Sequence, residues 1–113
     1  MVKIYTPNRG DFIWLDFNPQ TGKEQAKTRP ALVLSPLKYN RASSLALVCP
    51  VTSKYKGWGF EIALPNDFQV QGSILVDQLK SLDYSARNAK FIEKCPEAIM
   101  NDVLEKARLL LAS

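Results

Sequence analysis

The amino-acid sequence predicts a small, mainly β domain with one C-terminal helix. Short apolar segments recur about every ten residues, and Gly, Pro, Asn and Asp separate them, which is typical of a small barrel or sandwich. Apolar residues return at helical spacing only after Pro96. The 113 residues contain no linker, repeat or low-complexity stretch, so we expect a single domain over residues 1–113.

The first half of the chain contains three predicted strands, which span residues 12–17, 30–35 and 45–52. A polar loop at 23–28 separates the first two strands, and residues 38–44 are expected to form a helical turn. Pro36 ends the second strand. Pro50 lies inside the third strand, and because proline cannot donate to a sheet ladder, it indicates an edge strand or a bulge.

The second half contains three further predicted strands, at residues 60–64, 73–80 and 87–93. The second of these includes Asp77, a residue type that strands disfavour. Pro96 is the expected first helical residue, and Glu97 in the first turn suits the helix dipole. An apolar stripe is expected to pack on the barrel; its members are Ile99, Val103, Ala107 and Leu110. Together these segments predict a strongly bent sheet of five or six strands.

The chain contains no histidine, so it lacks the usual acid–base residue of neutral pH and the commonest zinc ligand. Catalysis would therefore depend on carboxylates, arginine, lysine, hydroxyls or thiols. Cys49 and Cys95 have no metal-ligand spacing, and two thiols fit a reducing compartment better than a disulfide framework. Residues 1–11 do not resemble a secretory signal, and no apolar run has the length of a membrane span. We therefore expect a cytoplasmic protein.

The net charge of +4 is unevenly distributed. Residues 1–60 carry nine Lys and Arg against three Asp and Glu, whereas residues 61–113 carry six against eight. The basic half also contains Tyr39, Tyr55 and Trp58. Basic residues among aromatic ones are typical of a surface that binds a polyanion such as nucleic acid. The alternative is ordinary solubilising charge.

Residues 22–30 form the first segment with candidate chemistry. A charged loop that begins with glycine leads there into Arg29 at the expected start of a strand. Loops on rigid barrels often carry functional residues, and the planar guanidinium suits a phosphate. The alternative is a structural ion pair between Arg29 and Glu24.

Two other segments contain polar residues near the ends of predicted strands. Thr52 ends the third strand, where a hydroxyl can donate to an anionic oxygen, although threonine is also simply common in strands. Asp77 could bond to backbone amides of a turn or act as a general base. Without histidine no Ser-His-Asp or Cys-His arrangement is possible, and the chain has no dinucleotide fingerprint or P-loop.

These segments together resemble one known family. The motifs are GDFIWLDF at 10–17, GKEQ at 22–25, RPALVLS at 29–35, CPVT at 49–52 and DQLK at 77–80. In order and spacing they are similar to the MazF/PemK toxins of bacterial toxin–antitoxin systems, and residues 22–40 are closest to the MazF branch. The resemblance extends over nearly the whole chain.

The resemblance implies a small SH3-like barrel of the CcdB/PemK toxin type, with a C-terminal helix, that forms a homodimer. It implies a sequence-specific endoribonuclease that cleaves single-stranded mRNA without a metal or other cofactor and inhibits translation and growth. The expected products carry a 2′,3′-cyclic phosphate and a 5′-hydroxyl. A cognate antitoxin with an acidic disordered tail would cover the RNA site, and contact with DNA would be only indirect, through the antitoxin complex. No membrane partner is implied.

The resemblance also assigns expected roles to residues. Arg29 would stabilise charge on the scissile phosphate, Thr52 would donate a hydrogen bond to it, and Glu24 or Asp77 would be the base. The PemK branch has an arginine acid where this chain has Leu75, so that scheme does not transfer intact. The expected RNA-binding residues are Gln25, Lys27, Ser53, Lys54, Tyr55, Lys56, Trp58, Gln78 and Lys80. For Trp14, packing in the core or at a dimer interface is the expected role.

Two alternatives come from other functional classes. The first is a non-catalytic toxin with the same barrel that poisons DNA gyrase by binding. The second is an SH3-like interaction module that binds an acidic peptide. Arg29 next to Pro30, together with Thr52, favours the nuclease.

Overall fold

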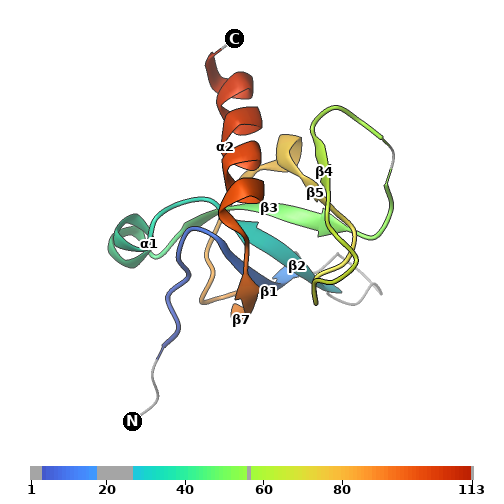
Figure 1. Ribbon diagram of the computed structural model, residues 1–113. Helices are drawn as coiled ribbons and strands as arrows, with labels where there is room; N and C mark the ends of the chain where they lie inside the picture. Colours follow the sequence, from blue (N-terminus) through green and yellow to red (C-terminus); the bar gives the residue numbers. More distant parts are fainter. Residues whose placement is uncertain (1–3, 18–26, 56, 113) are drawn as a thin grey trace, which may run out of the picture.

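The computed structural model of the chain describes residues 4–17, 27–55 and 57–112 (Figure 1). Over these residues the chain forms seven strands, two α-helices and one 3₁₀ turn. In chain order they are β1 (Asp11–Phe17), β2 (Lys27–Val33), α1 (Leu37–Ser43), β3 (Ala46–Thr52), β4 (Glu61–Ala63), β5 (Ser73–Leu75), η1 (Val76–Gln78), β6 (Lys80–Leu82), β7 (Lys90–Lys94) and α2 (Glu97–Ala112). The predicted class, a mainly β fold with a C-terminal helix, is confirmed.

The strands form one antiparallel sheet in the order β4-β5-β3-β2-β1-β7, with β6 also paired to β3. β3 is central, so the expectation that Pro50 marks an edge strand is wrong. The start of β3 pairs with β6 up to Val48, and its end pairs with β5 from Val51. Pro50 lies between these two ladders, opposite Ala31 of β2 on the other side. The proline is tolerated because one ladder is interrupted there.

Both faces of the central strands are buried. Phe12, Leu32 and Val51 pack on one face together with α2. Ile13, Ala31 and Val48 pack on the opposite face with Tyr84. Adjacent residues therefore enter different cores, as the alternation of side chains along a strand requires. This double burial holds the ends of β2 and β3 in fixed positions.

The predicted strand at 73–80 is instead β5, the turn η1 and β6. β5 and β6 pair with different parts of β3, so the chain must move along β3 between them. η1 makes this step, and the Leu79 amide donates to the Val76 carbonyl at 3.2 Å. Val76 is buried and Leu79 is partly buried, as side chains three residues apart in a 3₁₀ turn share a face. Asp77 therefore lies in a turn and not in a strand.

Two other strand boundaries differ from the prediction. β2 begins at Lys27 because Thr28 and Arg29 pair with β1, so part of the predicted polar loop is a strand. β7 begins at Lys90 rather than at residue 87. Asn88 has a φ of 56°, in the left-handed region, and this turn conformation delays the start of β7.

α2 packs its first three turns on the sheet. The Met100 amide donates to the Pro96 carbonyl at 3.0 Å, so Pro96 immediately precedes the helix instead of being its first residue. Val103 and Ala107 are buried as predicted, and Met100 joins them. Leu110 is 43% exposed, so its predicted place in the packed stripe is wrong. Figure 1 shows the reason: the end of α2 extends beyond the sheet.

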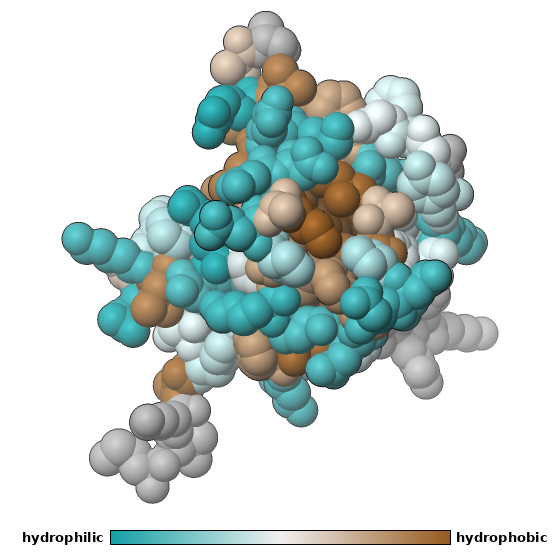
Figure 2. All heavy atoms as spheres, viewed as in Figure 1, coloured by the Kyte–Doolittle hydropathy of each residue, from teal (hydrophilic) through white to brown (hydrophobic). Residues whose placement is uncertain are grey.

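Hydrophilic side chains surround an apolar area beside α2 on the face shown in Figure 2. No helix of the described residues is both long enough and apolar enough to span a bilayer.

Candidate active site

A pocket of about 630 Å³ lies where β2 begins and β3 ends, beside η1. Its lining is mostly polar or charged, and it combines residues from strands, a loop and a turn. The residues are Arg29, Thr52, Lys54, Gly57, Trp58, Glu61, Leu75, Asp77 and Gln78. Six of these nine are residues that the sequence selected as catalytic or RNA-binding.

Arg29 and Thr52 reach the pocket from neighbouring strands. Arg29 lies in β2 opposite Leu15 of β1, and Thr52 ends β3 opposite Ser73 of β5. The Thr52 hydroxyl oxygen accepts the Lys54 amide at 3.1 Å, which leaves the hydroxyl hydrogen available to donate. Among the described residues, the exposed Arg29 has no ion-pair partner. The charged guanidinium of Arg29 and the hydroxyl of Thr52 therefore face the same pocket.

Trp58 and Asp77 form the one hydrogen bond that joins two lining side chains in the described part of the pocket. The indole Nε1 of Trp58 donates to Oδ2 of Asp77 at 2.8 Å. Both residues are exposed, with 56% of Trp58 accessible. The Trp58 ring also lies 6.1 Å from the Phe60 ring at an interplanar angle of 47°. This bond connects the loop between β3 and β4 to η1.

The loop between β3 and β4 extends from the body of the molecule in Figure 1 and is held at its C-terminal side. The Glu61 amide donates to the Trp58 carbonyl at 2.9 Å, and the Val76 amide donates to the Phe60 carbonyl at 3.0 Å. Gly57 has a φ of 75°, which favours glycine. Backbone bonds therefore place Trp58 beside Asp77.

Charges of both signs meet in the pocket. Arg29 and Lys54 supply positive charge, and Asp77 and Glu61 supply negative charge. Cys49 lies under η1, with its Sγ 3.9 Å from the Val76 carbonyl oxygen. Burial, and then the nearby Asp77 carboxylate, raise the pKa of the Cys49 thiol to about 12. At neutral pH the thiol is protonated, so Cys49 does not supply a nucleophile.

The remaining predicted residues either do not line the pocket or lie outside the described part of the chain. Ser53 and Tyr55 are exposed in the same loop but do not line the pocket. Lys80 lies in β6 and does not line the pocket; its Nζ is 5.6 Å from the centre of the Phe17 ring. Glu24, Gln25, Lys56 and the side chain of Lys27 are outside the described part of the chain.

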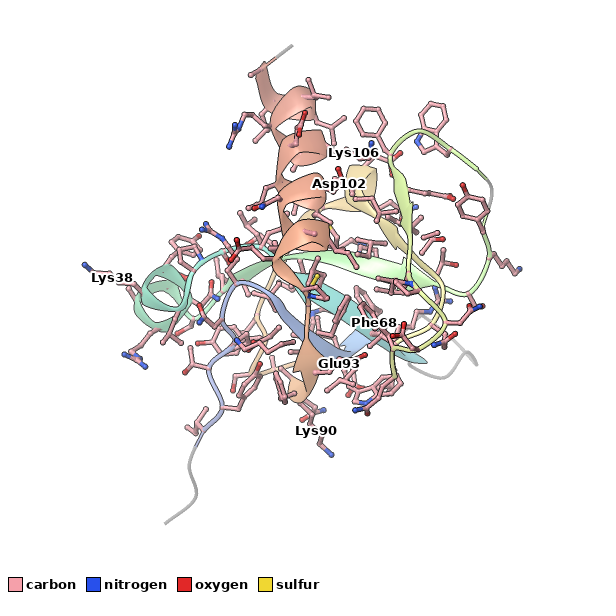
Figure 3. The ribbon with its side chains drawn as sticks, viewed as in Figure 1. Lys38, Phe68, Lys90, Glu93, Asp102 and Lys106 are labelled. Atoms are coloured by element: carbon pink, nitrogen blue, oxygen red, sulfur yellow. The ribbon has the colours of Figure 1, made fainter. Side chains whose placement is uncertain are left out.

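Trp14 is not a core residue in this chain, because 42% of its side chain is accessible. It lines a second pocket of about 570 Å³ with Asp16, Thr28, Asn88 and Lys90. Hydrogen bonds from Asn88 and Thr28, together with the positive charge of Lys90, lower the pKa of Asp16. Figure 3 shows Lys90 pointing away from the body of the molecule.

The sequence did not identify Gly57 or Glu61 as pocket residues, and it identified Leu75 only as a departure from the PemK branch. Glu61 and Leu75 are opposite each other in the β4–β5 ladder. Their contribution depends on the register of two short strands, which no local pattern specifies. Among the described residues there is no group of three or more acidic, Cys or His side chains arranged to hold a metal ion.

Comparisons with known proteins identify the family. Residues 8–111 match the family described as PemK-like, MazF-like toxin of type II toxin-antitoxin system. The chain is 46% identical over 89 residues to the endoribonuclease toxin MazF of Escherichia coli K12, covering 79% of each chain. It is 36% identical to Escherichia coli endoribonuclease PemK, covering 91% of this chain and 80% of PemK.

Solved structures agree with this assignment. A MazE–MazF crystal structure from Deinococcus radiodurans superposes with a TM-score of 0.91 at 43% identity, covering 97% of this chain and all of that chain. A MazF crystal structure from the same organism has a TM-score of 0.87 at 43% identity over the same coverage. The chain therefore belongs to the PemK-like, MazF-like toxin family of type II toxin–antitoxin systems.

Proposed function

We propose that this MazF-like endoribonuclease cleaves single-stranded mRNA in the pocket between β2, β3 and η1, without a metal, and thereby inhibits translation and growth. One observation carries the proposal: Arg29 and Thr52, from two different strands, face one volume. A guanidinium and a hydroxyl donor that face one volume suit the negative charge that builds up on a phosphate during cleavage of a phosphodiester. The names of the relatives agree with this activity.

The reaction we propose uses the ribose 2′-hydroxyl as nucleophile. A carboxylate, Glu24 or Asp77, takes its proton, the 2′-oxygen bonds to phosphorus, and the bond to the 5′-oxygen breaks. The products are a 2′,3′-cyclic phosphate and a 5′-hydroxyl, whose proton comes from Arg29 or from water. Arg29 and Thr52 stabilise charge on the non-bridging oxygens, and this stabilisation together with positioning supplies most of the acceleration.

The test uses a long single-stranded RNA in the presence of EDTA, with the cut ends mapped. We expect discrete cuts by the wild type and loss of cutting by Arg29→Ala. Arg41→Ala is the matched control, because Arg41 is an exposed arginine on α1 outside this pocket. Absence of discrete cuts by the wild type, or equal cutting by Arg29→Ala, would overturn the assignment. Failure to cut combined with gyrase inhibition would favour the non-catalytic alternative.

RNA affinity offers an independent measurement. If Arg29, Lys54 and neighbouring basic residues bind the phosphates of the RNA backbone, the affinity for RNA should fall steeply as the salt concentration increases. The reason is that each neutralised phosphate releases counterions. Filter binding of an uncleavable RNA over a salt series measures the slope. A flat response would contradict phosphate tracking.

We also propose that the chain forms a homodimer and that a cognate antitoxin inhibits it. Crystal structures of MazE–MazF from Deinococcus radiodurans, which this chain resembles closely, support an antitoxin partner. The basic first half of the chain supports an acidic, disordered tail as the inhibiting segment. When the antitoxin is titrated onto this chain, such a tail should protect the loop between β3 and β4 from proteolysis and block RNA binding over the same concentration range.

A further inference from the structure

We infer that Asp77 reads a nucleobase beside the scissile phosphate and that Trp58 orients its carboxylate for this purpose. The inference rests on the proposed function. It makes Asp77 a specificity-determining residue and leaves Glu24 as the base. It starts from the hydrogen bond of 2.8 Å between Trp58 Nε1 and Asp77 Oδ2.

The hydrogen bond from Trp58 gives the two oxygens of the Asp77 carboxylate different environments. Oδ2 accepts the indole N–H, whereas Oδ1 has no hydrogen-bond partner among the described residues. Asp77 lines the pocket and is exposed, so Oδ1 is accessible to a ligand there. An ionised carboxylate only accepts hydrogen bonds. The position therefore selects a group that donates.

Nucleobases differ in what they donate. Adenine, cytosine and guanine each carry an exocyclic amino group, whereas uracil has a single N–H between two carbonyl oxygens. Oδ1 of Asp77 therefore favours an amino-bearing base over uracil at one position next to the cut. Leaving a buried or desolvated donor or acceptor unpaired is what makes such selection effective.

The Trp58 ring supplies the remaining part of a base site. More than half of the side chain is exposed, and its packing against Phe60 at a tilt fixes the plane of the indole. Single-stranded bases stack on exposed aromatic rings of this kind. Trp58 thus offers a stacking surface and orients the adjacent acceptor, within the same pocket as Arg29.

The substitution Asp77→Asn tests the orientation directly. An amide has one accepting oxygen and one donating NH₂ group, and only the oxygen can accept the Trp58 N–H. Trp58 should therefore hold the amide with its NH₂ group toward the base. The preference should change from adenine and cytosine, whose amino group donates there, toward uracil, whose carbonyl accepts there. Adding Trp58→Phe keeps a ring but removes the donor, so the amide can rotate and the selection should disappear.

The experiment cleaves a randomised single-stranded RNA with the wild type, Asp77→Asn, Trp58→Phe and the double variant, and sequences the cut ends. Asp102→Asn is the control, since Asp102 is an exposed aspartate on α2 that does not line the pocket. We expect the wild type and the control to prefer an amino-bearing base over uracil by about 10-fold at one position. Asp77→Asn should reverse that preference, and the double variant should show none.

Three results would overturn the inference. One is equal cleavage by the wild type at uracil and amino-bearing bases at every position near the cut. Another is an unchanged preference in Asp77→Asn. The third is loss of cleavage by Asp77→Asn at all sequences with a normal thermal melt, which would make Asp77 the base. In each case cleavage by the wild type would leave the proposed function intact, whereas an inactive wild type would overturn both.

An independent measurement does not depend on activity. The indole N–H signal of Trp58 in a ¹H–¹⁵N spectrum should shift in Asp77→Ala, and the Trp14 signal should not. A Trp58 signal that does not respond to Asp77→Ala would contradict the orienting bond.

Discussion

The chain contains two groups of polar side chains that differ in their relation to water. Around Asn40, which is fully buried, the side-chain NH₂ group donates to the Pro7 carbonyl at 2.8 Å and to the Ser35 carbonyl at 3.0 Å. The Ser35 hydroxyl donates to the Asn40 side-chain oxygen, and the Tyr84 hydroxyl donates to the Asn40 carbonyl at 2.9 Å. In the pocket, by contrast, Arg29, Trp58 and Asp77 are exposed.

The difference separates stability from function. Every polar atom of the buried Asn40 side chain has a hydrogen-bond partner within the protein, so this group joins the N-terminal segment, α1 and β3 and is not open to a ligand. The pocket retains unoccupied donors and acceptors, which contribute little to folding but are available to a substrate. Substitutions in the first group should therefore reduce stability, and those in the second should reduce activity.

The largest expected effect is on cleavage. Arg29→Ala should lower kcat/KM by about 100- to 1,000-fold with little change in thermal stability, because an exposed donor to the transition state is lost. If Thr52 acts on the same phosphate, the double variant with Thr52→Ala should be scarcely worse than the worse single variant. Single-turnover kinetics on a defined RNA measure these values. Losses that multiply cleanly would show that the two residues act separately.

Asn40→Ala should produce the largest effect on folding. It removes the donor to two buried carbonyl oxygens and the acceptor of the Ser35 hydroxyl hydrogen, although the Ser35 oxygen still accepts the Leu47 amide, and it should cost about 3–4 kcal/mol of unfolding free energy. Urea unfolding measures this value, and Asn101→Ala on the exposed side of α2 is the control. Equal stability of the two variants would contradict the stabilising role of the buried group.

Gly72→Ala is expected to affect both stability and cleavage. Gly72 has a φ of 113°, and a Cβ there would overlap the Thr52 carbonyl oxygen. The substitution should cost about 2–3 kcal/mol and should also displace Thr52, so that cleavage falls in the protein that still folds. Gly59→Ala is the control, because a Cβ at Gly59 meets no atom within 4 Å. If Gly72→Ala left both stability and cleavage unchanged, the close approach would have no consequence.

The smallest expected effect compares two cysteines. Burial and then the nearby Glu93 carboxylate raise the pKa of Cys95 to about 11. Because Cys49 is buried and Cys95 is partly exposed, Cys95 should be alkylated faster than Cys49 in the folded protein at mildly alkaline pH. Mass spectrometry after iodoacetamide treatment measures both rates. Faster modification of Cys49 would contradict its burial under η1, and the two rates should converge in urea.

Much of the fold could be predicted because it follows from local patterns. Short apolar runs bounded by turn residues predicted β1 and β3, and the helical spacing of Val103 and Ala107 predicted α2. The single strand that was predicted at residues 73–80 was wrong because an apolar run does not show that the chain turns at Val76–Gln78 and then pairs with a different part of β3. The position of Pro50 was misread because no local pattern shows that β3 changes partners there.

By itself, the sequence determined which side chains could perform chemistry: Arg29, Thr52, Asp77 and Trp58, in a chain without histidine. Composition and motif suffice for this, since the chemical properties of a side chain belong to its type. Only the tertiary structure decided that Trp58 donates to Asp77, that Glu61 and Leu75 complete the pocket, and that Asn40 is buried. These relations depend on strand register and on contacts between distant residues, which arise only when the sheet closes around its two cores.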